Sequence, residues 1–216
     1  DLFDVSTREN AFHQIAKLGE TYPDLVDLLW DTPGVPGIII SEIVRIAGHA
    51  SGGPSATLTS SMANYACSLL NILQRSTTNP TTRRKLMETN ILSVIIPFIK
   101  STSRLRSFEY LRITTLGVFG ALVKADDKDI FPYLISNDII HACLKAMEMA
   151  PEISKIVAAF VLQKVITDEQ GLNYICQTYE RFSQMAMILG RIVLQIGKEP
   201  EPRLLKHVIR CYLRLS

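Results

Sequence analysis

The sequence has little net charge and no long apolar run. Its 23 basic and 21 acidic residues leave a formal net charge of +2 over 216 residues, so the total charge does not indicate a nucleic-acid or membrane partner. No stretch approaches the roughly 18 consecutive apolar residues that a membrane-spanning helix needs, and the apolar run Val94–Ile99 is broken by Pro97. We therefore expect a soluble, packed protein with no membrane partner.

Closely spaced cysteines are also missing. The four cysteines lie far apart and form no C-x-x-C pair, which argues against a zinc ribbon and a thioredoxin-type redox motif. We expect reduced, mostly structural thiols in an intracellular protein, although an even number of cysteines also permits a disulfide. The residues are Cys67, Cys143, Cys176 and Cys211.

Catalytic motifs are absent as well. The four histidines fall in separate segments with no H-E-x-x-H spacing, and no G-x-x-x-x-G-K-[ST] phosphate loop occurs. These absences predict a protein that is not an enzyme and that holds neither a metal nor a cofactor. The histidines are His13, His49, His141 and His207.

What the sequence does contain is helical periodicity along nearly its whole length. The capping-box pattern Ser6–Glu9 predicts the start of the first helix, Pro23 opens the second, and the Gly- and Pro-rich stretch 48–57 predicts an inserted loop. Further helices are expected at about Ile38–Ala47, Thr59–Arg75, Arg83–Glu88, Ile91–Lys100, Phe108–Lys124, Lys128–Ile135, Ile139–Met149, Glu152–Thr167, Gln170–Cys176, Tyr179–Ile196 and Arg203–Leu215. No segment alternates apolar and polar residues as a strand would.

A weak internal repeat accompanies this periodicity. The segment from Ala121 aligns with the segment from Val161 at a shift of about 41, and Asn90-Ile91-Leu92 resembles Asn137-Asp138-Ile139 at a shift of 47. Periods of about 40 to 47 residues are typical of armadillo and HEAT repeats, which stack into a solenoid. The sequence thus predicts an all-α, armadillo-type helical repeat superhelix forming a single domain over residues 1–216, with an irregular helical bundle as the alternative.

The helix predicted at Phe108–Lys124 holds two interior glycines, which usually need a packing or functional reason. At helical spacing, one stripe carries aromatic, small and polar residues, namely Tyr110, Thr114, Gly117, Ala121 and Lys124. Such a stripe is suited to the floor of a groove that receives a peptide, with Tyr110 as an anchor. The alternative is that the small residues only allow tight helix packing.

The last predicted helix carries basic residues at helical spacing, among them Arg203, Lys206 and Arg210. We expect them to lie with His207 and Arg214 opposite an apolar face that comprises Leu204, Leu205, Val208, Ile209 and Tyr212. This basic face could bind phosphates, and weak nucleic-acid binding is therefore an alternative function. The simpler interpretation is a solvated helix face.

Several longer runs resemble a known family. They are FEYLR, LGV-x-GALVK, YICQTYERF, AMILG and RLLKHV-x-RCYLRLS, and they are similar to the "required for cell differentiation" family, the armadillo-repeat subunit of the eukaryotic CCR-NOT mRNA deadenylase complex. The resemblance implies about five to six repeats and a noncatalytic adaptor that docks on the Not scaffold. It also implies binding of short peptides from repressors and of tryptophan-containing silencing proteins, the capacity to form a homodimer, and a location in cytoplasmic processing bodies and in the nucleus.

The resemblance also implies particular sites. The peptide groove should include Val157 besides Tyr110 and Gly117, and Tyr179 and Arg181 should line a tryptophan pocket in which the cation lies over the indole. Scaffold contacts should come from Asp31, Pro33, Gly37 and Val44. The sequence around Asp31 and Pro33 departs from the family's WHS-x-G pattern, which suggests a divergent paralogue with weaker docking. Relatives continue beyond Ser216, so we expect the terminal helices of the array to be missing here.

Overall fold

The computed structural model describes residues 1–50, 58–101, 103, 105–125 and 127–216. Thirteen α-helices and no strand occur in this described part, so the all-α prediction is confirmed, and the helix order is that of an armadillo-like array. The chain divides into two compact units, Asp1–Ala125 and Asp126–Ser216. The predictions of one domain and of five to six repeats stay predictions.

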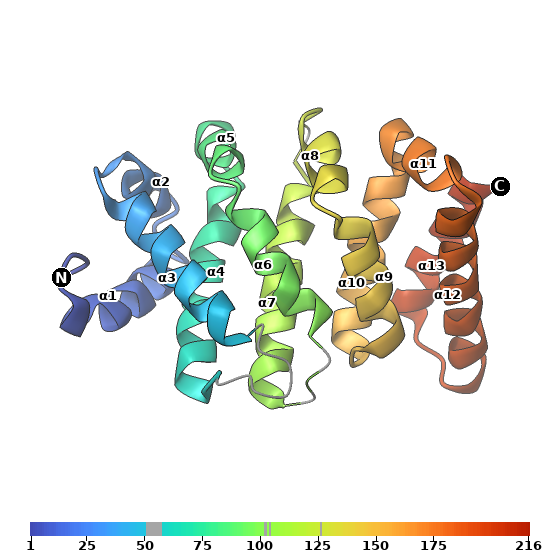
Figure 1. Ribbon diagram of the computed structural model, residues 1–216, viewed down its shortest axis with the longest axis horizontal. Coiled ribbons are helices and arrows are strands. Elements are labelled where there is room, and N and C mark those ends of the chain that lie inside the picture. The colour runs from blue at the N-terminus through green and yellow to red at the C-terminus, as the bar shows by residue number, and fades with distance from the viewer. Residues whose placement is uncertain (51–57, 102, 104, 126) are drawn as a thin grey trace. The chain divides into compact units, whose positions relative to one another are not determined.

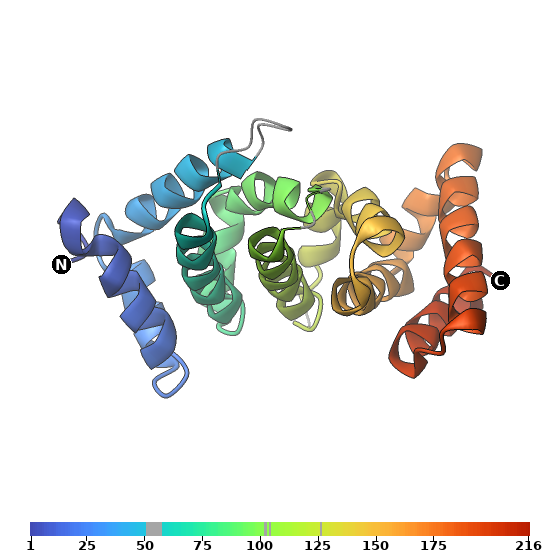
Figure 2. The same ribbon diagram turned by 90° about the horizontal axis from the view of Figure 1, so that it is seen from below.

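Unit 1 contains α1 to α7, and the helices other than the short α2 and α5 form two layers (Figures 1 and 2). The bounds are α1 Val5–Leu18, α2 Asp24–Asp31, α3 Val35–Ala50, α4 Ser60–Ser76, α5 Pro80–Glu88, α6 Ile91–Lys100 and α7 Arg106–Leu122. Helices α1, α4 and α7 lie side by side in one layer, and α3 and α6 form the other. Phe12, Leu69, Phe98 and Phe119 are buried between these layers, and this apolar burial stabilises the unit.

Unit 2 contains α8 to α13. The bounds are α8 Ile130–Ser136, α9 Ile139–Met149, α10 Glu152–Thr167, α11 Glu169–Cys176, α12 Tyr179–Lys198 and α13 Pro202–Leu215. Helix α10 packs against both α9 and α13, while α8 contacts α11 and α9 contacts α12. The helices α8, α9 and α10 therefore contact α11, α12 and α13, respectively. Leu162, Leu189 and Val208 belong to the buried core of this unit.

Corresponding turns in the two units share an unusual backbone conformation. Asn90, before α6, has φ 54°, and Asp138, before α9, has φ 60°. Asn and Asp tolerate this left-handed region better than other non-glycine residues. The weak sequence repeat at this place thus reflects a shared turn. The structure pairs Asn90 with Asp138 rather than with Asn137, so the predicted shift of 47 was one residue too short.

Several predicted helix ends are wrong. Helix α3 starts at Val35 rather than Ile38, α5 starts at Pro80 rather than Arg83, and α7 ends at Leu122 rather than Lys124. The first helix was predicted to start at the capping box Ser6–Glu9, but its N-cap is Asp4. The Asp4 carboxylate accepts a hydrogen bond from the Ser6 amide at 2.9 Å, so Ser6 lies inside the helix. The predicted loop at 48–57 starts too early, since α3 continues through Gly48 and His49 to Ala50. Residues 51–57 of that predicted loop lie outside the described residues.

Two further expectations concern membranes and thiols. Over the described residues, no helix is long and apolar enough to cross a membrane. All four cysteines are free thiols, so the disulfide alternative is wrong. Cys143 and Cys211 are buried, Cys67 is half-buried and Cys176 is exposed. Burial raises the pKa of the Cys143 thiol, which favours the neutral form expected of a structural cysteine.

Candidate functional site

The stripe predicted on the glycine-containing helix lies along the surface side of α7. Tyr110 is 46% exposed, Thr114, Gly117 and Ala121 are half-buried, and Lys124, just beyond the helix, is exposed. The opposite side of α7 supplies core residues, as expected, namely Leu111, Leu116, Phe119 and Leu122. The five residues of unit 1 assigned to a peptide groove are therefore in line and accessible.

Arg106 holds Tyr110 in place. Its guanidinium donates two hydrogen bonds to the Tyr110 hydroxyl, from Nε at 3.0 Å and from Nη2 at 2.8 Å. The same guanidinium lies 5.4 Å from the centre of the Tyr110 ring. These contacts position the ring at the end of the stripe, where it can serve as an amphipathic anchor.

Helix α4 supplies the other wall of this surface. Thr114 Oγ1 lies 3.6 Å from Cys67 Sγ, and a Cβ added at Gly117 would lie 2.9 Å from Gln74 Oε1. Gly117 thus makes room for the flexible end of Gln74, which supports the packing interpretation, while the stripe itself stays accessible, as a groove requires. We call Cys67, Gln74, Tyr110, Thr114 and Gly117 the α4–α7 surface.

Sequence reasoning missed Cys67 and Gln74, although the repeat contained a signal for them. Thr114 follows Cys67 by 47 positions, and Gly117 follows Gln74 by 43. Both separations are close to the repeat period, and residues one period apart lie on neighbouring helices in stacked repeats. The residues that precede Thr114 and Gly117 by one repeat period lie on α4, so the repeat could have identified this helix as the neighbour.

Val157 lies half-buried on α10, which belongs to unit 2. Its neighbours on this helix include the exposed Ile153 and Phe160, whose ring meets His207 edge-on at a centroid distance of 5.6 Å. Unit 2 therefore offers an apolar stripe of its own on α10. That Val157 shares one groove with Tyr110 stays a prediction.

Arg181, assigned to a tryptophan pocket, lines a small pocket of about 180 Å³ with Tyr174, His141 and Gln184. Its guanidinium lies 3.9 Å from the centre of the Tyr174 ring and donates a hydrogen bond to the Tyr174 carbonyl at 3.2 Å. One face of the planar cation is thus stacked on a tyrosine, so a partner's indole would meet the other face. Tyr179 is 81% exposed and is not among the residues that line this pocket.

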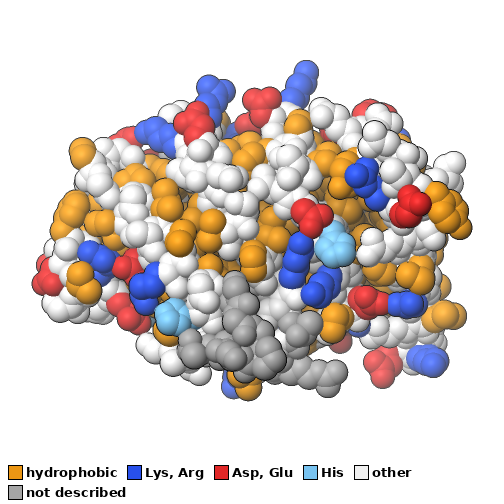
Figure 3. Space-filling model, in the orientation of Figure 1, with side chains coloured by type: hydrophobic (Ala, Val, Ile, Leu, Met, Phe, Trp, Pro, Cys, Tyr) orange, Lys and Arg blue, Asp and Glu red, His pale blue; other side chains and the backbone are white. Residues whose placement is uncertain are grey.

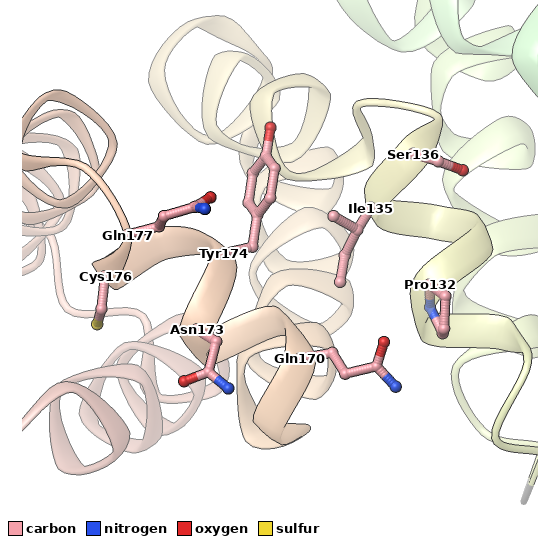
Figure 4. Close-up of a pocket in the computed structure, with 8 residues that line it drawn as sticks. All are labelled: Pro132, Ile135, Ser136, Gln170, Asn173, Tyr174, Cys176 and Gln177. Atoms are coloured by element: carbon pink, nitrogen blue, oxygen red, sulfur yellow. The ribbon is translucent and has the colours of Figure 1, made fainter.

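A wider groove of about 870 Å³ lies on the other side of Tyr174, between α8 and α11. In Figure 4, Ile135 points from α8 toward α11, and Gln170 extends from α11 toward α8. The remaining lining residues are Pro132, Ser136, Asn173, Cys176 and Gln177. Tyr174 therefore lines both hollows, and sequence reasoning missed it.

The residues assigned to scaffold docking are all accessible on α2, α3 and the turn between them. Gly37 and Val44 are exposed on α3, and a Cβ added at Gly37 would meet nothing within 4 Å. Pro33 is exposed in the turn, and Asp31 forms an exposed ion pair with Lys85, at 2.5 Å. Such a surface pair contributes little stability, typically about 0–1 kcal/mol. Scaffold docking by these residues stays a prediction.

The basic residues predicted on α13 have different surroundings from one another. Arg203, Lys206 and Arg210 are exposed, whereas Arg214 pairs with Glu169 and His207 contacts the side-chain oxygen of Gln163 at 2.9 Å. The predicted opposite face is wrong in part, because α13 packs on α10 through Leu204, Val208 and Cys211, while Leu205, Ile209 and Tyr212 are 37–55% exposed.

No group of three or more His, Cys, Asp or Glu side chains that could hold a metal ion was found in the described ranges. The arrangement of accessible stripes and pockets on stacked helices is suited to binding other molecules.

Comparison with known proteins identifies the family. The model of the Rcd1-like cell differentiation family matches residues 1–216. The chain belongs to this family. It is 42% identical over 211 residues to the cell differentiation protein rcd1 of Schizosaccharomyces pombe, covering 98% of this chain and 74% of that protein.

The chain is also 40% identical over 210 residues to protein CAF40 of Saccharomyces cerevisiae. That match covers 97% of this chain and 56% of the yeast protein. The family resemblance carried by the FEYLR and YICQTYERF runs is thereby confirmed, and the Rcd1-like helical array extends over nearly all of the chain.

Proposed function

We propose that this chain is a noncatalytic adaptor of the CCR-NOT deadenylase machinery, which binds peptides of mRNA-regulatory proteins and docks on the Not scaffold. In this role it supports deadenylation, mRNA decay and translational repression in the cytoplasm, including processing bodies, and in the nucleus. Membership in the Rcd1-like family supports the assignment to this machinery. The observation that carries the binding role is the α4–α7 surface, where an anchored tyrosine and small residues lie accessible in one line.

Peptide binding would use two properties of the α4–α7 surface. Tyr110 offers a rigid aromatic ring fixed by Arg106, and a ring held in advance loses little conformational entropy when a partner packs on it. Thr114 and Gly117 add little side-chain bulk, so a helix or an extended backbone can approach closely once the flexible end of Gln74 moves aside. A few such anchors dominate the affinity of most interfaces.

Tyr110→Asp and Gly117→Trp test this proposal. Tyr110→Asp replaces the apolar anchor with a charge, and Gly117→Trp fills the floor and displaces the end of Gln74, so each should weaken binding of a repressor peptide by at least about tenfold. Binding would be measured by fluorescence anisotropy with labelled peptides of translational repressors. The same protein samples would be tested in a pull-down with the central region of the Not scaffold, which should be retained.

Matched controls are Tyr22→Asp and Gly197→Trp, since Tyr22 is 62% exposed and a Cβ at Gly197 would meet nothing within 4 Å. Both should bind the peptide as the unmodified protein does, and melting temperatures would confirm folding. Undiminished peptide binding by both Tyr110→Asp and Gly117→Trp would refute the α4–α7 surface as the groove. Failure of the unmodified chain to retain the Not scaffold would refute the docking part alone.

A second candidate function is weak nucleic-acid binding through Arg203, Lys206 and Arg210. It is favoured by the exposure of the three side chains along one helix. Against it, acidic Glu199 and Glu201 lie directly before them in the sequence, and Glu201 caps α13 through the Arg203 amide at 3.1 Å.

A further inference from the structure

Helices α1 and α4 enclose a polar groove that the proposed peptide surface does not use. Its volume is about 430 Å³, within the usual range of ligand sites, roughly 300–1,000 Å³. The residues that line it at helical spacing are Ser6, Glu9, Asn10 and His13 of α1 and Ser61, Asn64 and Tyr65 of α4. Two polar stripes thus face each other across the groove.

Tyr65 gives an independent sign that something binds here. The residue is 4% exposed, and its hydroxyl, which is buried, has no hydrogen-bond partner among the described residues. Burial raises the pKa of Tyr65, so the phenol stays neutral at physiological pH. A buried polar group without a partner is unfavourable, and such groups are usually satisfied by a bound molecule or water.

The nearby carboxylate of Glu42 does not meet this need. It accepts hydrogen bonds from Arg8 at 2.9 Å and from Arg45 at 2.6 Å. Two guanidinium groups thus pair with this one carboxylate, so its charge is more than balanced within unit 1. Glu9, by contrast, carries the one carboxylate that lines the groove, and within the described part of the chain it forms no ion pair. Its partner is the Ser61 hydroxyl, which donates a weak hydrogen bond at 3.3 Å.

The remaining polar groups offer mainly acceptors. The Ser68 hydroxyl lies 3.3 Å from the Asn64 carbonyl oxygen and 3.1 Å from His13 Nδ1. When the hydroxyl donates to the carbonyl, the imidazole donates to Ser68 through Nδ1. A neutral His13 therefore keeps Nε2 as an acceptor. The side-chain amides of Asn10 and Asn64 have no hydrogen-bond partner among the described residues, and each presents a carbonyl oxygen.

We propose that this groove receives the guanidinium group of an arginine side chain presented by a protein partner. A guanidinium has five N–H donors and no acceptor, which complements the Glu9 carboxylate, the His13 nitrogen, the two amide oxygens and the Tyr65 hydroxyl oxygen. Its positive charge is opposite to that of the Glu9 carboxylate, and charge-assisted hydrogen bonds are the stronger kind. This inference does not depend on the proposed adaptor function, because the groove shares no residue with the α4–α7 surface.

The test uses the full chain and two small probes of nearly equal shape. N-acetyl-arginine methylamide carries the guanidinium, and N-acetyl-citrulline methylamide replaces it with a neutral urea. Titration of ¹⁵N-labelled protein should give saturable amide shifts in α1 and α4 with the arginine probe, and binding at least about tenfold weaker with the citrulline probe. Shifts of equal size with both probes, shifts located elsewhere, or no saturable shift would overturn the proposal and leave a groove filled by water.

Two variants identify the groups responsible. Glu9→Gln keeps the shape and removes the charge, so it should weaken the arginine probe at least about fivefold. The control Glu180→Gln, in unit 2, should leave binding unchanged. Tyr65→Phe removes the unpaired hydroxyl and should weaken binding about two- to fivefold without lowering the melting temperature. Unchanged binding by Glu9→Gln would refute the site, and so would unchanged binding by Tyr65→Phe.

Discussion

Gly171 occupies a position in α11 at which the chain has no room for a side chain. A Cβ there would lie 1.9 Å from the carbonyl oxygen and 2.7 Å from the carbonyl carbon of Val165, near the end of α10. Backbone atoms cannot move aside as a flexible side chain can. The close approach of α11 to the end of α10 thus depends on this glycine.

Replacement of Gly171 by alanine should destabilise the protein by about 1–3 kcal/mol or more, because overpacking outweighs the gain in helix propensity. The matched change Gly197→Ala, in α12, should stabilise it by about 0.5–1 kcal/mol, since a Cβ there meets nothing within 4 Å. Urea denaturation followed by circular dichroism measures both. Equal stability of the two variants would show that Gly171 is not sterically confined.

Residue-level prediction from sequence succeeded where helical spacing alone sets the outcome. Spacing placed Tyr110, Thr114 and Gly117 on one accessible side of α7, as the structure has them. It did not identify Gln74 or Tyr174, because contacts between helices depend on the register of packing, which the periodicity of a single helix does not contain. Tyr65 was missed for a related reason, since an unpaired hydroxyl is visible only once its surroundings are known.

At the scale of the element, the helices themselves were more predictable than their ends. Glu152–Thr167 and Ile139–Met149 were predicted to the residue, because long apolar periodicity is the strongest local signal. The N-cap of α1 was misplaced because Ser6 and Asp4 both have capping side chains, and the carboxylate of Asp4 bonds both the amide and the hydroxyl of Ser6. Helix ends depend on such local competition between neighbouring caps.

The contact between α10 and α13 predicts a pH dependence. Burial, together with the nearby charges of Arg210 and Lys206, lowers the pKa of His207 below its ordinary value of 6.5. The unfolded chain therefore binds this proton more readily than the folded chain. The contribution of neutral His207 to the free energy of unfolding is fully present above about pH 6.5. This contribution is lost as the pH falls through the lowered pKa.

His207→Gln should reduce the loss of stability on acidification, because glutamine does not titrate. The measurement is the free energy of unfolding by urea at several pH values from 7.5 downward, for the variant and the unmodified protein. The difference between the two proteins should be constant above about pH 6.5 and should change in favour of the variant below it. Parallel curves over the whole range would assign the acid sensitivity to other groups.

At the scale of the whole molecule, the 23 basic and 21 acidic residues nearly balance. On the face shown in Figure 3, lysines and arginines lie among aspartates and glutamates, in keeping with a formal net charge of +2. An interspersed surface attracts polyanions weakly, because the field of each cation is largely cancelled nearby. On this face, the charge distribution thus gives no support to the nucleic-acid alternative.

Filter binding of single-stranded RNA over a salt series tests the nucleic-acid alternative. If Arg203, Lys206 and Arg210 contact phosphates, the logarithm of the affinity should fall with the logarithm of salt concentration at a slope of about −2. Arg203→Glu combined with Arg210→Glu should lower the affinity, whereas Lys17→Glu with Arg84→Glu, an equal change in charge at exposed positions, should lower it less. A flat salt response would reject phosphate contacts.

Side-chain hydrogen bonds between helices connect residues that are close along the chain. From Arg8 to Glu42 the separation is 34 residues, and from Gly19 to Arg75 it is 56; the contact of Gln163 with His207 spans 44. The partner helix of each contact therefore lies roughly one repeat further along the sequence. During synthesis on a ribosome, the first helices can begin packing while the later ones are still untranslated. Each apolar helix face is therefore exposed to solvent only briefly.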